Sequence, residues 1–326
     1  MDAIAIVGPT ASGKTDFAVR LAEKLNTEII SADSMQFYKG MEIGTAVPPI
    51  EIRNKIPHHF IAFVPPNYEM NAGIFQQLAR KEIIRLKGEG KIPILVGGSG
   101  LYLSALIDGL FEGPGRSEKI RKKIREELLY KGAEALFNKL KGVDPTYATR
   151  LTSPNDIVRV IRALEVYELT GIPFSEWHRK HFEKAKPLYV LQLAIQWERE
   201  LLYERINHRV EKMIKEGWIQ EVEQLLNEGY EHDIYRLKAL GYREIVNYLK
   251  GEQNLKEAIE HTKQHHRRYA KKQLTWFRAD KRIVWYQMNK TLKEEDLLNW
   301  AVQQVDQFYN NNSFYKEQPC FLFRHY

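Results

Sequence analysis

The residues whose chemistry is easiest to read form the loop "GPTASGKT" at positions 8–15. This loop fits the pattern G-x-x-x-x-G-K-[ST], in which Gly8 and Gly13 allow backbone angles that bring successive N–H groups onto phosphate oxygens. Lys14 adds a positive charge to such a cradle, and the Thr15 hydroxyl can bind a Mg²⁺ ion that the phosphates also hold. We therefore predict a phosphate or diphosphate site. The pattern alone leaves open whether the phosphate belongs to a nucleotide.

Two more polar residues follow apolar runs and could take part in the same chemistry. Asp33 in "IISADS" comes just after the run at 28–31, and Ser99 in "VGGSG" ends the run that starts at residue 92. Ligands of open α/β sheets bind beyond the carboxyl ends of the strands, so Asp33 is placed to act as a base near the phosphate loop. An equally good interpretation of Asp33 is that it caps the next turn or holds Mg²⁺. Ser99 would offer a hydroxyl to a ligand, and the alternative is that it belongs to an ordinary tight turn.

Apolar runs separated by helical patterns indicate the elements that must position these loops. The runs lie at 3–7, 28–31, 59–64, 92–98, 189–197 and 282–286. Short, continuous apolar strands that alternate with helices are typical of a parallel sheet with both faces covered. The first run enters the phosphate loop, and Phe17, Leu21 and Leu25 after it recur every four residues, as in an amphipathic helix.

Strand signals stop between residues 113 and 186, where the sequence becomes helical and charged. We interpret this stretch as an inserted all-helical domain that contains "SEKIRKKIREELLYKG", with Gly132 as a plausible helix end. The 326 residues suffice for one large core and a satellite domain. We therefore expect an α/β core formed by residues 1–112 and 187–310, the insertion at 113–186 and a tail at 311–326.

Composition restricts the class of protein further. The formal charge of +7 favours a polyanionic partner. The single cysteine, Cys320, excludes a disulfide framework and a cysteine metal site, and it fits a reducing, cytoplasmic setting. No apolar run approaches the length that spans a membrane, so we expect no membrane partner.

Basic residues with helical spacing could bind a polyanion. Lys263, Arg267 and Lys271 recur every four residues with aromatic residues nearby, a pattern that suits a phosphate backbone and unstacked bases. Arg205 and Arg209 also lie four residues apart, on one stripe of a predicted amphipathic helix. Arg209 could reach a diphosphate, or the two arginines could form ordinary pairs with glutamates at the surface.

Six segments resemble, in order, the signature series of the tRNA dimethylallyltransferases, also called tRNA isopentenyltransferases. They are the phosphate loop, "ADSMQFYKGMEIGTA", "VGGSGLYLSAL", "NDIVRVIRALEVYELTG", "KALGYREI" and "RRYAKKQLTWFR". The resemblance implies a P-loop NTPase or kinase-like α/β core with an inserted all-helical domain that binds tRNA. It also implies transfer of a dimethylallyl group from dimethylallyl diphosphate to N6 of the adenosine at tRNA position 37, 3′ of the anticodon, giving N6-isopentenyladenosine and diphosphate.

The resemblance further implies roles for individual residues. Asp33 corresponds to the family's catalytic aspartate and would accept a proton from the attacking amine, with Ser99 and Lys14 as further catalytic residues. The diphosphate of the donor would be bound by Gly8, Thr10, Ala11, Ser12, Gly13, Lys14, Thr15 and Arg209, with Thr15 also binding Mg²⁺. The tRNA would be bound by Asp33, Ser34, Met35, Gln36, Ser99, Arg121, Val158, Arg159, Val160, Ile161, Arg162, Lys238, Gly241, Tyr242, Arg243, Lys263, Arg267 and Lys271.

Two positions depart from the family's pattern. Ser99 stands where threonine is more frequent, and Val47 stands where lysine is common. The Ser99 hydroxyl keeps its expected role, whereas the role of the missing lysine is either absent or supplied by a neighbour. The remaining expectations are Mg²⁺ as cofactor, the anticodon stem-loop of tRNA and dimethylallyl diphosphate as partners, and a monomeric, cytoplasmic protein.

Two other classes of protein fit parts of the sequence. A small-molecule P-loop kinase could carry a charged lid like the insertion, but an NTP hydrolase usually has a Mg²⁺-binding Asp where Gly97 and Gly98 stand here. A non-catalytic RNA-binding module could retain the loop, although its near-complete pattern and Asp33 argue against that class. Within the family, an enzyme that modifies free adenine nucleotides is the closest alternative, and the basic insertion favours tRNA.

Overall fold

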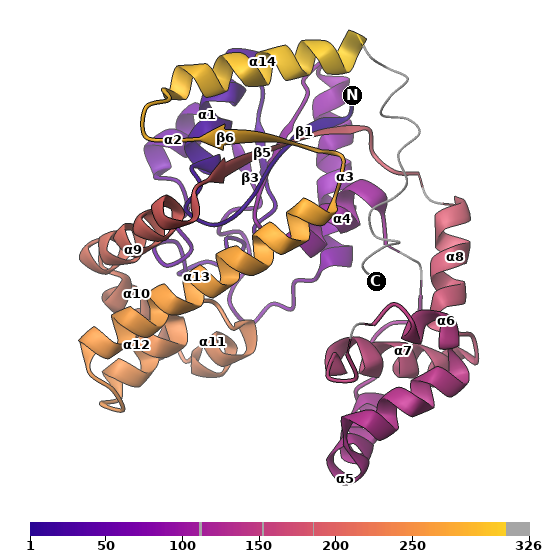
Figure 1. Ribbon diagram of the computed structural model, residues 1–326. Coiled ribbons are helices and arrows are strands. Elements are labelled where there is room, and N and C mark those ends of the chain that lie inside the picture. Colours follow the sequence, from indigo (N-terminus) through magenta and orange to yellow (C-terminus); the bar gives the residue numbers. More distant parts are fainter. Residues whose placement is uncertain (111–112, 152, 185, 311–326) are drawn as a thin grey trace. The chain divides into compact units, whose positions relative to one another are not determined.

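The computed structural model of the chain describes residues 1–110, 113–151, 153–184 and 186–310. The predicted tail at 311–326, with Cys320, lies outside the described residues. The described chain forms two compact units, one built from residues 1–107 and 188–310 and the other from residues 108–187 (Figure 1). The insertion expected at 113–186 falls inside the second unit.

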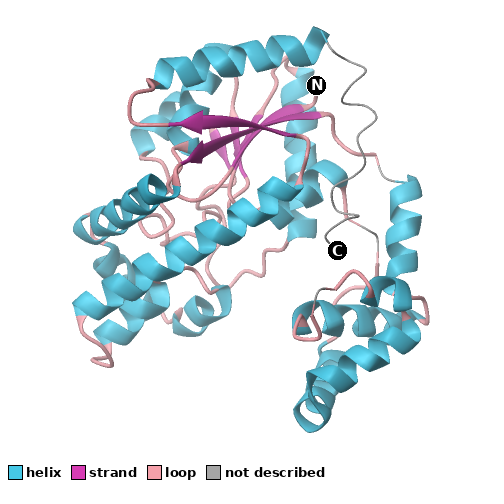
Figure 2. Ribbon diagram, viewed as in Figure 1, coloured by secondary structure: helices cyan, strands magenta, loops and turns pink. Residues whose placement is uncertain are grey.

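The first unit contains a six-stranded sheet in which every pair of neighbouring strands is parallel (Figure 2). The strands are β1 (Ala3–Val7), β2 (Ile29–Ser31), β3 (His58–His59), β4 (Ile94–Val96), β5 (Val190–Trp197) and β6 (Ile283–Met288). Their order is β3-β2-β4-β1-β5-β6, so the loops that follow β1, β2 and β4 open at the same edge. The predicted α/β fold with a parallel sheet is confirmed.

Alternate side chains of β1 enter apolar clusters on opposite faces of the sheet. Ala3, Ala5 and Val7 belong to one cluster, whereas Ile4 and Ile6 belong to the other. Successive side chains of a strand point to opposite faces, so a strand buried on both faces must be apolar throughout. This burial explains why "AIAIV" is a continuous apolar run.

Helices cover both faces of the sheet (Figure 1). On one face α3 and α4 contribute Phe75 and Leu106, and on the other α1 and α14 contribute Leu21 and Phe308. The helices of this unit are α1 (Lys14–Leu25), α2 (Ile50–Lys55), α3 (Ala72–Gly88), α4 (Gly100–Asp108), α9 (Arg199–Lys215), α10 (Trp218–Asn227), α11 (Glu231–Leu237), α12 (Tyr242–Leu249), α13 (Leu255–Ala279) and α14 (Glu294–Asn310). None of the described helices is long and apolar enough to cross a membrane.

The strand predicted at 59–64 is wrong for most of its length. Only His58 and His59 pair with β2, and the chain then turns. Phe60 and Ala62 have φ angles of 63° and 46°, which are incompatible with a strand. The apolar side chains of this run are buried from a turn, and a short apolar sequence cannot distinguish a turn packed on the core from a buried strand.

The second unit is helical, as predicted. Its helices are α5 (Glu118–Val143), α6 (Pro145–Ala148), α7 (Ile157–Thr170) and α8 (Phe174–Lys184). They enclose an apolar cluster that includes Ile124, Phe137 and Leu164. Gly132 interrupts α5 with a φ of 78°, so the predicted helix end is a kink between two helical segments.

A fully buried carboxylate, Glu165, organises the polar part of this unit. Its oxygens accept hydrogen bonds from Arg121 Nε at 2.9 Å, from Arg162 at 2.8 Å and from the Ser117 N–H at 2.8 Å. Burial alone raises the pKa of Glu165, but the hydrogen bonds from Arg121 and Arg162 outweigh it, so the pKa is lowered. Arg121 and Arg162 therefore stabilise the fold of this unit by compensating a buried charge.

Candidate functional site

The phosphate loop connects β1 to α1 and needs unusual backbone angles. Gly8 and Gly13 have φ angles of 132° and 91°, which L-residues with side chains rarely adopt. Ala11, between them, has a φ of 62°, a left-handed conformation that costs a non-glycine residue about 1 kcal/mol. Such strain persists only where surrounding contacts hold the backbone in place.

Hydrogen bonds from other elements hold the carbonyl groups of the loop. Arg205 Nε donates to the Ala11 carbonyl at 2.8 Å, and Trp197 Nε1 donates to the Ser12 carbonyl at 2.9 Å. In a trans peptide the N–H points opposite to the carbonyl, so these bonds turn the N–H groups of Ser12 and Gly13 away from Arg205 and Trp197. The tethers therefore prepare two N–H donors for an anion before it binds.

Two side chains of the loop lack the partners that an anion would provide. Among the described residues the buried Ser12 hydroxyl has no hydrogen-bond partner, which is costly unless a ligand supplies one. Lys14 Nζ donates to the Pro9 carbonyl at 2.5 Å. Burial and, to a lesser extent, the positive charge of Arg209 lower the pKa of Lys14 to about 7, and the charge of Asp33 opposes them. An anionic ligand would accept a hydrogen bond from the Ser12 hydroxyl and would stabilise the charged form of Lys14.

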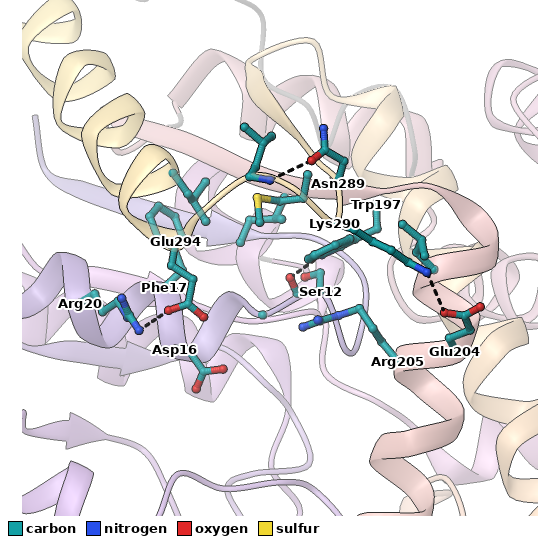
Figure 3. A pocket seen from close by; sticks show the side chains of 16 residues that line it. Ser12, Asp16, Phe17, Arg20, Trp197, Glu204, Arg205, Asn289, Lys290 and Glu294 are labelled. Atoms are coloured by element: carbon teal, nitrogen blue, oxygen red, sulfur yellow. Dashed lines mark hydrogen bonds and ion pairs between the residues drawn. The ribbon is translucent and has the colours of Figure 1, made fainter.

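A cavity of about 380 Å³ borders the loop on one side, and we call it the Trp197 cavity (Figure 3). Its lining includes Ser12, Phe17, Trp197 and Arg205, and the Arg205 guanidinium lies 4.5 Å from the centre of the Trp197 ring. No candidate base from β2 or its following loop lines this cavity. The Trp197 cavity contains Arg205 and Trp197, the two side chains whose hydrogen bonds hold the carbonyls of the phosphate loop. This cavity was not predicted from the sequence.

A second cavity, of about 250 Å³, contains the candidate base, and we call it the Asp33 cavity. Its lining comes from six separate segments of the sequence. The residues are Thr10, Asp33, Ser34, Met35, Gly44, Thr45, Arg209, Lys238, Ala239, Leu240, His266 and Tyr269. The structure thus brings together six of the predicted site residues, which are Thr10, Asp33, Ser34, Met35, Arg209 and Lys238.

Asp33 caps a turn and also faces the cavity, so the two interpretations of this residue are compatible. Its Oδ1 accepts the Met35 N–H at 3.1 Å, which occupies one of the four lone-pair positions of a carboxylate. Ser99 supports the same turn, because its Oγ accepts the Ser34 N–H at 3.0 Å. The charge of Asp33 acts on Lys14 and on Arg209, which places all three in one electrostatic cluster.

Arg209 is the arginine that faces the cavity. Burial lowers its pKa, the charges of Asp33 and Asp16 oppose this, and its Nε has no hydrogen-bond partner within the described part of the chain. Arg205, one turn earlier on α9, instead bonds to the Ala11 carbonyl. Of the two interpretations of this pair, the structure favours an Arg209 that can reach an anion over simple pairing at the surface.

The predicted RNA-binding positions fall into two groups by burial. The side chains of Val158, Arg159, Lys238, Arg243 and Lys271 are exposed or half-buried. The side chains of Gln36, Val160, Ile161 and Tyr242 are buried and belong to the framework that carries the exposed positions. Gly241 is buried as well, and a Cβ there would lie 2.1 Å from Trp218. Motif position alone did not distinguish these two groups.

Five of the basic residues predicted to bind RNA already have polar partners within the chain, among them Arg159, which lies 3.3 Å from Asp156. Lys263 lies 2.8 Å from both Glu211 and Glu260, and Arg267 donates to Asn207 at 2.6 Å. Arg162 belongs to the Glu165 cluster together with Arg121. Lys271 is exposed, and so are its neighbours Arg268 and Lys272. The exposed face of α13 that could bind a polyanion is therefore centred on residues 268–272.

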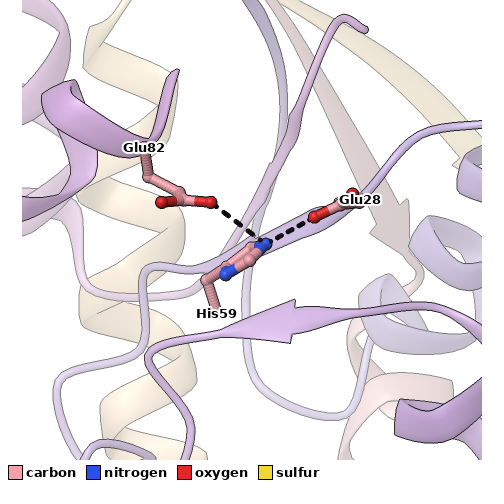
Figure 4. A group of neighbouring side chains, drawn as sticks. All are labelled: Glu28, His59 and Glu82. Carbon is pink, nitrogen blue, oxygen red and sulfur yellow. Dashed lines mark hydrogen bonds and ion pairs between the residues drawn. The ribbon is translucent and has the colours of Figure 1, made fainter. Parts of the chain in front are cut away.

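An acidic cluster lies at the opposite end of β2 (Figure 4). His59 Nε2 is 2.8 Å from Glu28 and 3.4 Å from Glu82, an arrangement that could in principle hold a metal ion. However, Lys91 and Arg85 lie 2.6 and 3.1 Å from Glu28 and already compensate its charge. Glu28 precedes β2 and Asp33 follows it, so this cluster is not at the phosphate loop.

Sequence reasoning missed the polar side chains that α13 directs at the site. His266 and Tyr269 line the Asp33 cavity, and Gln273 accepts a hydrogen bond from the Thr10 N–H at 2.8 Å. Positions 266, 269 and 273 have the three- and four-residue spacing of one helix face. That spacing was the available signal, but the basic residues on the exposed face of the helix were more conspicuous.

Comparison with known proteins gives consistent matches. A family model described as IPP transferase matches residues 36–280. A protein of Geobacillus thermodenitrificans named tRNA dimethylallyltransferase is 47% identical over 288 residues, which cover 87% of this chain and 90% of that protein. One of Geobacter sulfurreducens with the same name is 46% identical over 282 residues, covering 86% and 90%.

Solved structures also match. The tRNA isopentenylpyrophosphate transferase of Bacillus halodurans is 38% identical with a TM-score of 0.67, covering 94% of this chain and 97% of that chain. A eukaryotic dimethylallyltransferase, described as acting on tRNA, is 28% identical with a TM-score of 0.78, covering 97% and 81%. The likeness therefore extends over both compact units.

Lys14 should take up a proton when inorganic diphosphate binds. At about pH 8, above the pKa of about 7, most Lys14 side chains are neutral in the free protein, and the negative ligand favours the ammonium form. Diphosphate affinity should therefore fall as the pH rises from about 7 to about 9. Titration calorimetry in buffers of different ionisation enthalpy measures the uptake, and Lys14→Met corrects for protonation of the ligand itself. Equal uptake by both proteins would contradict the lowered pKa.

Proposed function

Because this chain belongs to the IPP transferase family, we propose that it transfers a dimethylallyl group from dimethylallyl diphosphate to N6 of the adenosine at position 37 of tRNA. The observation that carries this proposal is the Asp33 cavity, where a candidate base and the phosphate loop meet at one edge of the sheet. This arrangement suits a reaction that needs an anionic leaving group and a proton acceptor in the same place.

The chemistry follows from groups of the phosphate loop together with Asp33 and Arg209, which line the Asp33 cavity beside Thr10 of that loop. The C1–O bond of the donor breaks while a bond forms from adenosine N6 to C1, and negative charge develops on the departing diphosphate. The N–H groups of Ser12 and Gly13, with Lys14 and Arg209, would bind that charge. Asp33 would accept the proton that N6 loses. The adenine amine is a weak nucleophile, so its positioning and the removal of its proton should both contribute.

We propose that Mg²⁺ assists the leaving group. The Thr15 hydroxyl follows Lys14 at the start of α1 and is the ligand this loop would offer to an ion held by the diphosphate. The ion would supply additional neutralisation of the phosphate charge. The buried Ser12 hydroxyl, which has no partner among the residues that the structure describes, fits a loop that is completed by an anion and its cation.

The small-molecule kinase is disfavoured by packing at the end of β4. A Cβ at Gly97 would lie 2.3 Å from the carbonyl oxygen of Ala32, and one at Gly98 would lie 2.2 Å from Gln273. An aspartate that holds Mg²⁺ for a nucleotide could therefore not stand at position 97 without a shift of the backbone, and at position 98 it would displace the end of the Gln273 side chain. The absence of an aspartate at position 97 thus has a steric reason in this structure.

Nucleotide should be dispensable for the reaction. Purified protein, unmodified tRNA, dimethylallyl diphosphate and Mg²⁺ should suffice to form N6-isopentenyladenosine, with one diphosphate released per modified adenosine, because no phosphoryl transfer is needed. Mass spectrometry of the tRNA and an assay of released diphosphate measure both products. An absolute requirement for ATP, with ADP formed in step with product, would revive the kinase alternative.

Replacing Asp33 with asparagine should slow single-turnover transfer about a hundredfold or more, with tRNA affinity nearly unchanged. The amide oxygen of asparagine can still accept the Met35 N–H, so the turn should persist. Asp233→Asn is a matched control, because that carboxylate pairs with Arg236 and does not line the Asp33 cavity. A wild-type transfer rate in Asp33→Asn would remove this residue from the mechanism.

Exposed lysines of α13 should contribute to the salt dependence of tRNA binding. Replacing Lys271 and Lys272 with alanine should reduce the slope of log affinity against log salt by about 1 to 2, as expected when two phosphate contacts are lost. Lys263→Ala should change the slope less, because Lys263 is already paired with Glu211 and Glu260. Filter binding at several salt concentrations measures the slopes. If the double variant keeps the wild-type slope, RNA does not bind this face.

A further inference from the structure

One buried side chain, Gln273 of α13, connects two of the loops that form the site. Its Oε1 accepts the Thr10 N–H at 2.8 Å, and its Nε2 donates to the Gly98 carbonyl at 2.9 Å. Thr10 belongs to the phosphate loop after β1, and Gly98 belongs to the loop after β4. Gln273 is 5% exposed and uses both ends of its amide, so it is a specific bridge between α13 and the two loops.

The loop after β4 is shaped to admit α13. A Cβ at Gly98 would lie 2.2 Å from Gln273 Nε2, and one at Gly100 would lie 2.4 Å from Trp276. Two glycines therefore allow two side chains of the same helix to approach the backbone. In Figure 1, α13 is the long orange helix that runs from α12 toward α4, which Gly100 begins. Because Gln273 of α13 is bonded to both loops, a shift of α13 would also shift the phosphate loop.

The bond to Thr10 fixes the orientation of a peptide in the phosphate loop. Because the Thr10 N–H points at Gln273, the carbonyl of Pro9 in the same peptide points the opposite way, where it accepts from Lys14. The next residue, Ala11, has the left-handed φ of 62°. Without Gln273 this peptide could rotate, and both Lys14 and the strained Ala11 would lose their support.

The same helix carries groups that face the proposed substrates. Arg268, Lys271 and Lys272 are exposed within the two turns around Gln273. Tyr269, one turn before Gln273, lines the Asp33 cavity. RNA bound to the basic face of α13 would fix the position of this helix. Through the bond between Gln273 and the Thr10 N–H, it would therefore also affect the conformation of the phosphate loop.

We propose that Gln273 is a positioning residue that couples the binding of tRNA to the binding of the donor's diphosphate. The inference rests on the proposed function, because it takes the exposed face of α13 as part of the RNA-binding surface. Coupling is reciprocal, so RNA strengthens diphosphate binding by the same factor by which diphosphate strengthens RNA binding. Removing the bridge should abolish this factor while leaving the RNA surface intact.

The test compares two glutamines of α13 replaced by methionine, which has a similar length and no amide. Gln273→Met removes the bridge, and Gln264→Met is the control, because Gln264 is exposed on the same helix. Calorimetry gives the dissociation constant of inorganic diphosphate with and without saturating anticodon stem-loop RNA. The wild type and Gln264→Met should show tightening by RNA of about fivefold or more. Gln273→Met should show a factor near one, with RNA affinity alone changed less than about twofold.

A second variant disturbs the same bridge from its other end. In Gly98→Ala the new methyl group would displace the far end of the flexible Gln273 side chain, and the nearest atom outside Gln273, the Gly8 carbonyl oxygen, is at an ordinary 3.5 Å. This variant should fold and lose the coupling as Gln273→Met does. Loss of coupling in both, with thermal unfolding close to that of the wild type, distinguishes positioning from general destabilisation.

The outcomes separate this inference from the proposed function. If the wild type binds diphosphate and RNA and forms product, but both variants keep wild-type coupling, the role of Gln273 is wrong and the function stands. Coupling absent from the active wild type also overturns the role of Gln273. If the wild type binds neither diphosphate nor the stem-loop, the proposed function itself fails, and this inference fails with it.

Discussion

A loop that binds an anion through its backbone must keep its N–H groups pointing inward before the anion arrives. Here that constraint is met by holding the outward groups of the loop: Arg205 and Trp197 bond to carbonyls, and Gln273 bonds to the Thr10 N–H. Each tether fixes the orientation of one peptide, and together they maintain the left-handed Ala11. The local sequence permits this loop, but residues about two hundred positions later hold it in place.

The charges of the site are balanced differently from those elsewhere in the protein. Glu28 and Glu165 are carboxylates whose burial is fully compensated by nearby cations, and both have a lowered pKa. Around the phosphate loop the basic groups are not compensated in this way, because burial lowers the pKa of both Lys14 and Arg209. The carboxylates of the structural clusters are neutralised internally, whereas Lys14 and Arg209 are basic groups whose charged forms an anionic ligand would stabilise.

Much of the fold and part of the site could be predicted from local patterns. The phosphate loop, the parallel sheet and the helical insertion depend on glycines and on apolar periodicity, which report the burial of each segment directly. The strand predicted at 59–64 was wrong for most of its length, because an apolar run buried in a turn has the same composition as a strand. Arg121 and Lys263 illustrate a second limit, since a basic residue in sequence gives no sign of the carboxylate that it meets in space.

The sequence by itself therefore determined which groups are present: the loop with its Lys14 and Thr15, the aspartate after β2 and the basic helix. Only the tertiary structure decided which of them act together, placing Arg209 and Tyr269 around Asp33 and using Gln273 to join α13 to the loop. The physical reason is that conformation and burial follow from short-range chemistry along the chain. Hydrogen bonding and charge compensation at the site instead depend on distances between segments that only packing of the whole core sets.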